Sequence, residues 1–231
     1  MSDSPLPSGL ISVGEGSPWL LAAEGAVFHV PSATAVIADV HLGYEWARAS
    51  GGDSLPAHSL AETLAKLDRL LGRVKVAKLI VAGDLVETPG PCSKTARDVR
   101  SLVVWLRDRE VASLFLRGNH DPSRTPPLPS SIVLDGWTIQ HGDRALPEGP
   151  CIFGHHHPAL KSNGLVAPCF LIGARTIALP AFSPNAAGLD VTTWMLPGPL
   201  RRESLRCVAG LGGELLDFGP LAALVQKLAT S

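Results

Sequence analysis

Residues 34–41 read TAVIADVH, a short apolar run that ends on an aspartate and a histidine. The chain repeats this pattern with KLIVAGD at residues 78–84 and ASLFLRGNHD at residues 112–121. Runs of this length and composition are typical of strands that are buried on both faces, as the strands of a parallel sheet are. We therefore predict strands at Thr34–Asp39, Lys78–Asp84 and Ala112–Gly118.

Helical patterns fill the gaps between these strands. Ser59–Val74 carries leucines at helical spacing, and Ser59 with Glu62 predicts a capping box at its start. Ser93 is the predicted N-cap of a second helix, which runs to Arg109. We expect this helix to bury Val99, Leu102, Val103 and Leu106. The order strand, helix, strand, helix, strand indicates an α/β fold with a largely parallel sheet.

The second half of the chain has a different pattern, in which Gly and Pro separate short apolar runs. We predict that these runs are strands of a second sheet: Trp137–His141, Cys151–Phe153, Cys169–Ile172, Thr176–Leu179 and Val191–Leu196. A last helix is expected at Leu221–Leu228. The stretch Pro122–Ser131 is rich in Pro and Ser and predicts a rigid loop that overhangs a site.

Length and composition favour one folded domain. A chain of 231 residues can build one sizeable core, and we expect a single domain over residues 1–231. Lys plus Arg number 20 and Asp plus Glu number 21, so the charges nearly cancel. No strong overall field attracts nucleic acid or a membrane surface, and a polyanionic substrate must therefore be attracted locally.

The four cysteines and the N-terminus exclude some classes of protein. The cysteines are far apart without a CxxC pair, which argues against a structural zinc knuckle and a disulfide scaffold. The N-terminus shows no signal-peptide pattern, and no apolar run has the length of a membrane span. We expect a cytoplasmic protein without a membrane partner, and the oligomeric state stays open.

Six of the eight histidines lie in short motifs that follow the predicted strands, whereas His29 and His58 are expected to be ordinary surface or helix-start residues. The motifs are Asp39-Val40-His41, Gly83-Asp84, Gly118-Asn119-His120-Asp121, His141-Gly142 and Gly154-His155-His156-His157-Pro158. Alone, a DxH or a GD after a strand is usually a polar turn. Their ordered recurrence at the carboxyl ends of strands, where open α/β sheets bind ligands, indicates a metal site.

The residue types of these motifs indicate the chemistry. Carboxylate, imidazole and amide ligands without thiolate suit divalent ions such as Mn, Fe, Zn, Ni or Co. Two such ions roughly 3.5 to 4 Å apart clamp a phosphate and lower the pKa of a bridging water, which gives a metal-activated hydroxide for in-line attack. The motifs supply enough ligands for two ions.

The ordered set DxH, GD, GNHD, H and GHxH between Asp39 and His157 resembles the signature of the calcineurin-like metallophosphoesterase superfamily. The resemblance implies two divalent ions, Mn first, with Fe, Zn, Ni and Mg as alternatives. It assigns Asp39, His41 and His157 to one ion, Asn119, His141 and His155 to the other, and Asp84 to both. It implies that His120 acts on the phosphate as a general acid or hydrogen-bond donor and that Asp121 orients it. His156 is not expected to be a ligand.

Three further stretches suggest a closer resemblance. ADVHLGYE at residues 38–45, GHHHPAL at residues 154–160 and LPAFSP at residues 179–184 resemble the ICC-like predicted phosphoesterases related to the SbcD nuclease, which include the ligase-associated DNA damage response endonucleases. This family implies a two-sheet β-sandwich flanked by helices, in four αββα layers. The segment LVETPG after Asp84 departs from the family pattern, and it removes no ligand.

These observations predict a binuclear phosphoesterase, most specifically a phosphodiesterase or nuclease linked to DNA repair. The near-neutral charge favours an alternative substrate, a small nucleotide or a phosphorylated metabolite, because duplex binding relies on several Lys and Arg contacts. Another alternative is an inactive interaction module with the same fold. Five arginines in or near the site-forming loops suit either substrate: Arg48, Arg117, Arg124, Arg144 and Arg175.

Overall fold

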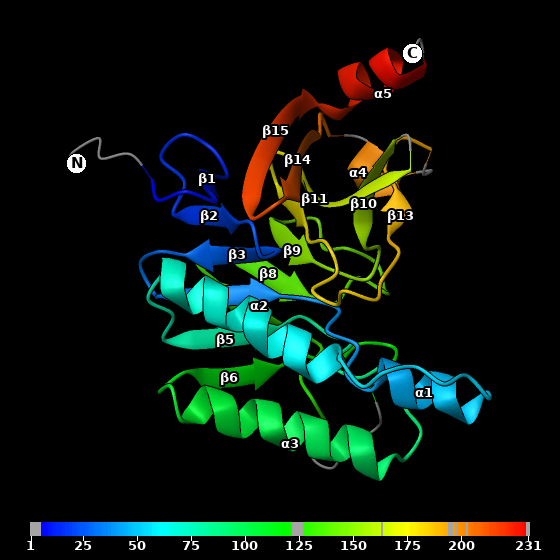
Figure 1. The fold of residues 1–231 in the computed structure, drawn as a ribbon. Coiled ribbons are helices and arrows are strands. Elements are labelled where there is room, and N and C mark those ends of the chain that lie inside the picture. Colours follow the sequence, from blue (N-terminus) through cyan, green and yellow to red (C-terminus); the bar gives the residue numbers. More distant parts are fainter. Residues whose placement is uncertain are drawn as a thin grey trace.

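The fold consists of two β-sheets packed face to face, with helices outside each (Figure 1). It is seen in a computed structural model that describes residues 6–121, 127–162, 164–193, 196, 198–201 and 203–229. One sheet has six strands and the other nine.

The first sheet contains the three strands predicted from the buried apolar runs. They are β4 (Thr34–Ile37), β5 (Lys78–Val81) and β6 (Ala112–Phe115). Lys78 is paired with Thr34 on one side and with Ala112 on the other, and both ladders are parallel, as predicted. Three antiparallel strands that the sequence did not reveal extend this sheet: β1 (Leu10–Ser12), β2 (Trp19–Ala22) and β3 (Ala26–His29).

Two long helices cover the outer face of the first sheet, as Figure 1 shows. They are α2 (Ser59–Arg73) and α3 (Ser93–Arg107), and a short α1 (Tyr44–Ser50) precedes them. Leu67 and Leu102 are fully buried in one cluster with residues of β4 and β5. The apolar faces of both helices therefore fix them against the sheet.

The predicted N-caps were wrong by one residue, although α2 starts at Ser59 as predicted. Ser59 is the first residue of α2 and His58 is its N-cap, so the buried Ser59 hydroxyl lies inside the first turn and makes no cap bond. Likewise Cys92, not Ser93, is the N-cap of α3, without a side-chain cap bond. The position of His58 at a helix start agrees with its prediction.

Burial along α3 differs from the prediction at one position. Leu102 and Leu106 are buried and Val99 packs partly against the core, but Val103 is 37% exposed. Each residue advances a helix by about 100°, so the position after Leu102 turns away from the sheet. An apolar side chain at that point therefore faces solvent.

The second sheet follows in the chain. Its strands are β7 (Ser131–Leu134), β8 (Trp137–Gln140), β9 (Cys151–Phe153), β10 (Pro158–Ser162), β11 (Leu165–Ile172), β12 (Thr176–Ala178), β13 (Leu189–Asp190), β14 (Arg206–Leu211) and β15 (Glu214–Pro220). The strand order along this sheet is β13-β10-β11-β12-β9-β8-β7. Outside this order, β14 pairs with β11 on one side and with β15 on the other. The strands β8, β9 and β12 are parallel neighbours.

The strand predicted at Val191–Leu196 was wrong. The strand in this region is β13, which ends at Asp190, and residues 191–193 form a turn. The Asp190 carboxylate accepts hydrogen bonds from the backbone N–H and the hydroxyl of Thr192, which favours a turn over a strand. Residues 194 and 195 lie outside the described residues.

The interior between the sheets confirms the predicted two-sheet sandwich. Trp19, Leu21 and Val36 from the first sheet share one buried cluster with Ile152 and Phe170 from the second. On the far side of the second sheet, α4 (Gly198–Arg201) and α5 (Leu221–Ala229) contribute Leu200, Leu221 and Leu224 to a separate cluster. The predicted αββα order of layers is therefore confirmed.

His29 is not the surface residue that the sequence suggested. It is 4% exposed, and its Nδ1 lies 2.7 Å from Ser32 Oγ. Its Nε2 lies 3.2 Å from a carboxylate oxygen of Asp135, in the turn between β7 and β8. The two sheets are thus joined by a polar link that has no part in the histidine motifs.

Among the described residues, no helix combines the length and apolar character that crossing a membrane requires.

Candidate metal centre

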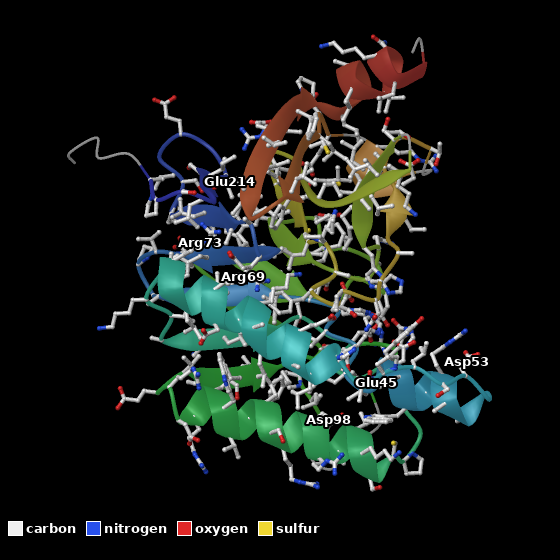
Figure 2. All side chains as sticks on the ribbon, viewed as in Figure 1. Glu45, Asp53, Arg69, Arg73, Asp98 and Glu214 are labelled. Atoms are coloured by element: carbon white, nitrogen blue, oxygen red, sulfur yellow. The ribbon has the colours of Figure 1, made fainter. Side chains whose placement is uncertain are left out.

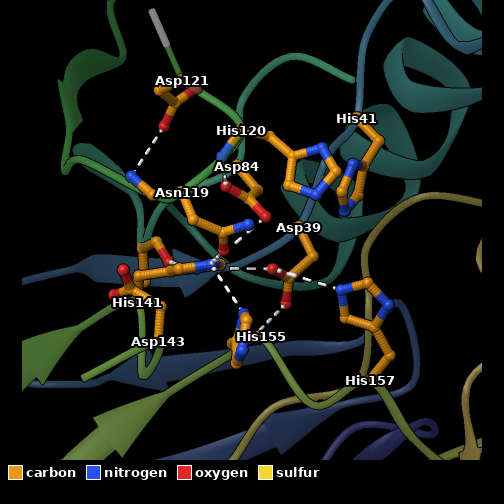
Figure 3. A network of polar contacts seen from close by, with 12 residues as sticks. Asp39, His41, Asp84, Asn119, His120, Asp121, His141, Asp143, His155 and His157 are labelled. Carbon is orange, nitrogen blue, oxygen red and sulfur yellow. Dashed lines mark hydrogen bonds and ion pairs between the residues drawn. The ribbon is translucent and has the colours of Figure 1, made fainter. Parts of the chain in front are cut away.

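The histidine and carboxylate motifs meet at one edge of the sandwich (Figure 3), past the carboxyl ends of β4, β5, β6, β8 and β9. Asp39 and His41 follow β4, Asp84 follows β5, Asn119 and His120 follow β6, His141 follows β8, and His155 and His157 follow β9. Parallel neighbours place their carboxyl ends at the same edge, so the topology brings together residues more than a hundred positions apart. The structure thus gathers all seven predicted metal ligands and His120.

The backbone of this site is held in an unusual conformation. Asp39, His41, Asp84, His155 and His157 all have positive φ angles, between 47° and 68°. This region costs a residue other than glycine of order 1 kcal/mol or more, and such strain persists only where the surroundings enforce it. Hydrogen bonds between the loops do so here: the His41 N–H donates to the Asp84 carbonyl at 3.0 Å, and the His155 N–H donates to Asp39 Oδ2 at 2.9 Å.

Two glycines allow the loops to approach closely. A Cβ atom on Gly118 would lie 2.1 Å from Asp84 Oδ1, and one on Gly154 would lie 2.4 Å from Asp39 Oδ2. Both contacts are with fully or nearly fully buried carboxylates, which have no room to move. The motif glycines are therefore required by the packing around Asp39 and Asp84.

One half of the site centres on His141, which is 1% exposed. Its Nδ1 faces the Ala82 carbonyl at 3.2 Å, and three polar atoms surround its Nε2. These atoms are Asn119 Oδ1 at 2.8 Å, His155 Nδ1 at 3.1 Å and Asp84 Oδ2 at 3.2 Å. A single Nε2 cannot satisfy three partners at once. We refer to these four residues, Asp84, Asn119, His141 and His155, as the His141 half.

The other half of the site consists of Asp39, His41 and His157, and we refer to it as the His41 half. Asp39 Oδ1 lies 3.4 Å from His157 Nε2 and 3.5 Å from His141 Nδ1. Within the described chain, Asp39 Oδ1, His41 Nε2 and His157 Nε2 are buried without a hydrogen-bond partner, and His41 Nδ1 faces only a carboxylate oxygen of Glu87. Native proteins rarely bury polar atoms in this way, and a bound ion is one of the few explanations.

The distances in both halves fit the spacing of ligands around a cation. A divalent ion bound to nitrogen and oxygen at about 2.1 Å separates neighbouring ligand atoms by roughly 3.0 to 3.4 Å. The contacts quoted above run from 2.8 to 3.5 Å. The unpaired buried atoms and the thiol-free donor set agree with that spacing, so the residues fit divalent ions.

The charges of the two aspartates dominate the electrostatics of the site. Burial favours a lower pKa for His141, but its contact with Asp84 and the charges of Asp39 and Asp84 raise this pKa. Burial opposes ionisation of Asp84, yet His141 and the His120 N–H lower the pKa of this carboxyl. Burial and the neighbouring His141 lower the pKa of His155. The site therefore keeps the Asp84 carboxylate charged, as a cation site requires.

His120 is oriented by Glu87 and not, as predicted, by Asp121. The Nδ1 of His120 lies within hydrogen-bond distance of the Glu87 carbonyl. Asp121 instead accepts hydrogen bonds from the N–H groups of Gly118, Leu85 and Val86, at 2.9 to 3.3 Å. Buried N–H groups need an acceptor, so the Asp121 carboxylate ties the β5 and β6 loops together.

Glu87 is the functional candidate that the sequence did not reveal. Its Oε2 lies 2.9 Å from His41 Nδ1, and Glu87, His41 and His120 form a third group close enough to share an ion. A cavity of about 210 Å³ opens here, lined by His41, Tyr44, Glu87, His120, His157, Ser183, Asn185 and Ala186. The only available signal was the position of Glu87 three residues after Asp84, in the segment that departs from the family pattern.

The five arginines separate into different surroundings. Arg117 and Arg144 line a cavity beside His141. Arg48 pairs with Asp53, and the Arg175 guanidinium donates to the Glu148 carbonyl, so neither joins the metal ligands. Arg124 and residues 122–126 of the predicted overhanging loop lie outside the described residues. His156 belongs to none of the candidate ion-binding groups found in the described chain.

Comparisons with known proteins agree with this geometry. The model of the calcineurin-like phosphoesterase family matches residues 33–167, which contain all the candidate ligands. A comparison with curated proteins gives no match. Among solved structures, the crystal structure of Pseudomonas putida nuclease MPE is similar, with 26% identity, a TM-score of 0.68, and coverage of 90% of this chain and 100% of that chain.

Proposed function

This chain belongs to the calcineurin-like phosphoesterase family, and on that premise we propose that it is a two-metal phosphodiesterase that cleaves nucleic acid. The observation that carries the proposal is the convergence of seven metal-capable side chains with His120 at the ends of five strands. The similarity to a nuclease over 90% of the chain supports nucleic acid as the substrate. A role in DNA repair, expected from the sequence, is part of the same proposal.

The two halves of the site would each hold one divalent ion, with Mn first among the candidates. The His41 half would supply Asp39, His41 and His157, and the His141 half would supply Asn119, His141 and His155. A bridging role for Asp84 is supported by its position between the two groups in Figure 3. When bound, the two ions would hold the phosphate ester and make a water molecule acidic enough to attack phosphorus.

His120 would complete the reaction on the leaving-group side. Its Nδ1 faces the Glu87 carbonyl, so Nε2 is the atom free to give a proton to the leaving oxygen. The T-shaped contact of the His120 and His41 rings, with centroids 5.1 Å apart, keeps this imidazole next to the candidate ligands. Asp121 would act through the backbone, because it fixes the loop that carries Asn119 and His120.

The proposal is tested with protein reconstituted with Mn²⁺ after removal of its metals. The substrates are p-nitrophenyl phosphate, bis-p-nitrophenyl phosphate, single-stranded DNA and duplex DNA, and Asp84→Asn is the control variant. We expect metal-dependent cleavage of the small diester and of DNA, and almost none by the variant. Cleavage of the small diester but not of DNA would contradict the nuclease activity and favour a small nucleotide or metabolite as the substrate. No metal-dependent hydrolysis of any substrate would contradict the whole proposal.

A further inference from the structure

A second cavity adjoins the metal centre on the side of His141. It measures about 160 Å³ and is lined by Arg117, Ser130, Gln140, His141, Gly142, Asp143, Arg144 and Ala145. His141 belongs both to this wall and to the candidate ligands, so whatever occupies the cavity lies next to the His141 half. Figure 3 shows Asp143 on this side, away from His41 and His120.

Two arginines reach this cavity from two different ligand loops. Arg117 directly precedes Gly118 and Asn119, and its N–H is fixed by the Pro129 carbonyl at 2.9 Å. Arg144 follows His141 by three residues. The backbone of Arg117 is therefore held in a set position relative to the metal centre, and Arg144 lies in the loop that follows a candidate ligand. This arrangement differs from that of arginines scattered over a surface.

The guanidinium groups are available to a ligand. The Arg144 side chain is 67% exposed, and a carboxylate oxygen of Asp143 lies 3.9 Å from its Nε. Within the described part of the chain, the terminal nitrogens of Arg144 and the side chain of Arg117 contact no acceptor. Guanidinium groups bind phosphate through paired N–H donors, and such charge-assisted bonds are the strong ones.

The cavity on the opposite side of the metal centre, beside His41 and His120, has a lining of the opposite charge. Its described lining contains no lysine or arginine, and it carries the Glu87 carboxylate beside His41 and His120. An extended polyanion would therefore be attracted on the His141 side and repelled on the other. This asymmetry is local, because the chain as a whole carries a net charge of −1.

We propose that the cavity between Arg117 and Arg144 binds a second phosphate of the substrate, next to the one that is hydrolysed. This inference rests on the proposed phosphodiesterase function and makes it more specific. A second phosphate is present in every oligonucleotide and absent from a simple diester. Two arginines would thus give a nearly neutral protein its preference for a strand. The described side chains are drawn on the ribbon in Figure 2. Arg117, Arg144 and the candidate ligand His141 line the same cavity.

The test uses a matched pair of substrates, a p-nitrophenyl diester of thymidine with and without a second phosphate on the same nucleoside. In the wild-type protein we expect the second phosphate to lower KM by about tenfold, the effect of one charge-assisted contact. The double variant Arg117→Ala/Arg144→Ala should lose this advantage. The control Arg107→Ala, an exposed arginine paired with Asp108, should keep it. An advantage that persists in the double variant would overturn the proposal.

A binding measurement separates this inference from the proposed function. Fluorescence anisotropy with a single-stranded oligothymidylate, without added metal, should show about tenfold weaker binding by the double variant. It should also show a salt dependence that is smaller by roughly 0.7 per lost phosphate contact. If the two proteins differ in this way but the wild-type protein hydrolyses no diester, the second-phosphate site would be supported and the proposed phosphodiesterase function would be contradicted. Equal binding of the oligothymidylate by both proteins, with a second-phosphate advantage on thymidine that the double variant keeps, would remove the site. Equal binding of the oligothymidylate, with a second-phosphate advantage on thymidine that the double variant loses, would overturn the preference for a strand and assign the site to small nucleotides.

Discussion

The two halves of the metal centre are built from the same residue types, yet the protein supports them differently. In the His141 half, Nδ1 of the imidazole faces the Ala82 carbonyl at 3.2 Å, with Asp39 Oδ1 at 3.5 Å, and Nε2 is surrounded by Asn119, His155 and Asp84. In the His41 half, His41 Nδ1 faces the Glu87 carboxylate. Three other buried polar atoms of this half, Asp39 Oδ1, His41 Nε2 and His157 Nε2, have no hydrogen-bond partner among the described residues.

This difference predicts that the two halves would depend on metal to different degrees. Each unpaired buried polar atom costs about 1 to 3 kcal/mol, and a bound ion would remove that cost. The polar atoms of the His141 half contact one another, so a bound ion would remove less of this cost there. We therefore expect metal to stabilise the fold chiefly through the His41 half, and Glu87 to make His41 a stronger ligand.

The largest effect is expected at Asp84, the ligand proposed to serve both halves. Asp84→Asn keeps the size of the side chain but removes its charge. Activity on bis-p-nitrophenyl phosphate should fall at least about a thousandfold, since several kcal/mol of stabilisation are lost. Metal analysis should show the loss of both ions. A variant that keeps two ions and most of its activity would show that Asp84 serves neither half.

A substitution of His120 separates catalysis from metal binding in both halves. His120→Ala should slow cleavage of DNA, whose leaving group is poor, by about a hundredfold or more. Bis-p-nitrophenyl phosphate should lose much less activity, because p-nitrophenolate leaves without a proton. The metal content should stay the same. An equal loss on both substrates, measured as kcat, would exclude the general-acid role.

Substitutions of Glu87 test whether the two halves of the site bind metal independently. Glu87→Ala should weaken binding of one ion by about 10- to 100-fold and leave the other unchanged, because only His41 loses its support. Glu87→Gln keeps a hydrogen-bond acceptor for His41 and should recover most of the affinity. Isothermal titration with Mn²⁺ measures both steps. Since the Glu87 carbonyl remains in both variants, kcat at saturating metal should stay near the wild-type value. Equal weakening of both ions would contradict the difference between the halves.

The smallest effect concerns a support beneath the His41 half. Lys66 of α2 donates to the Phe182 carbonyl at 3.0 Å, and the next residue, Ser183, donates its N–H to the Asp39 carbonyl. Burial, with the nearby charge of Arg69, lowers the pKa of Lys66 from 10.5 to about 8, against the opposing charge of Glu24. The folded chain thus holds fewer protons than the unfolded chain between these two pH values, so this group makes stability rise with pH there.

Lys66→Met should remove that rise. Relative to the variant, the wild-type protein should gain stability between pH 8 and 10.5, by about 1 to 3 kcal/mol. Urea unfolding at a series of pH values measures the gain. A constant difference in the free energy of unfolding over this range would show that Lys66 keeps an ordinary pKa in the folded protein.

The parts of the fold and site that follow from sequence are those set by local pattern and topology. The apolar runs before Asp39, Asp84 and Asn119 predict parallel strands, and parallel strands end at one edge, so these side chains meet. The histidine motifs after two predicted strands of the second sheet added His141, His155 and His157, and the family resemblance implied the role of each. All seven gather in the structure, although their assignment to individual ions stays a prediction.

The parts that sequence did not reveal depend on contacts between distant segments. Glu87 matters because a loop turns its carboxylate toward His41 and its carbonyl toward His120, and neither contact follows from sequence spacing. Asp121 was predicted to orient His120, its neighbour in sequence, but its carboxylate accepts hydrogen bonds from backbone N–H groups of two loops. His29 was placed at the surface because nothing local showed that Asp135 would reach it across the sandwich.

The number of ions that the protein binds tests the central claim most directly. Metal-free protein is titrated with Mn²⁺, desalted and analysed for bound metal per chain, and hydrolysis of bis-p-nitrophenyl phosphate is followed in parallel. We expect two ions per chain, bound in two steps, with activity that appears as the second site fills. A protein that binds no Mn²⁺, or that gains no activity from it, would contradict the proposal of a two-metal phosphodiesterase.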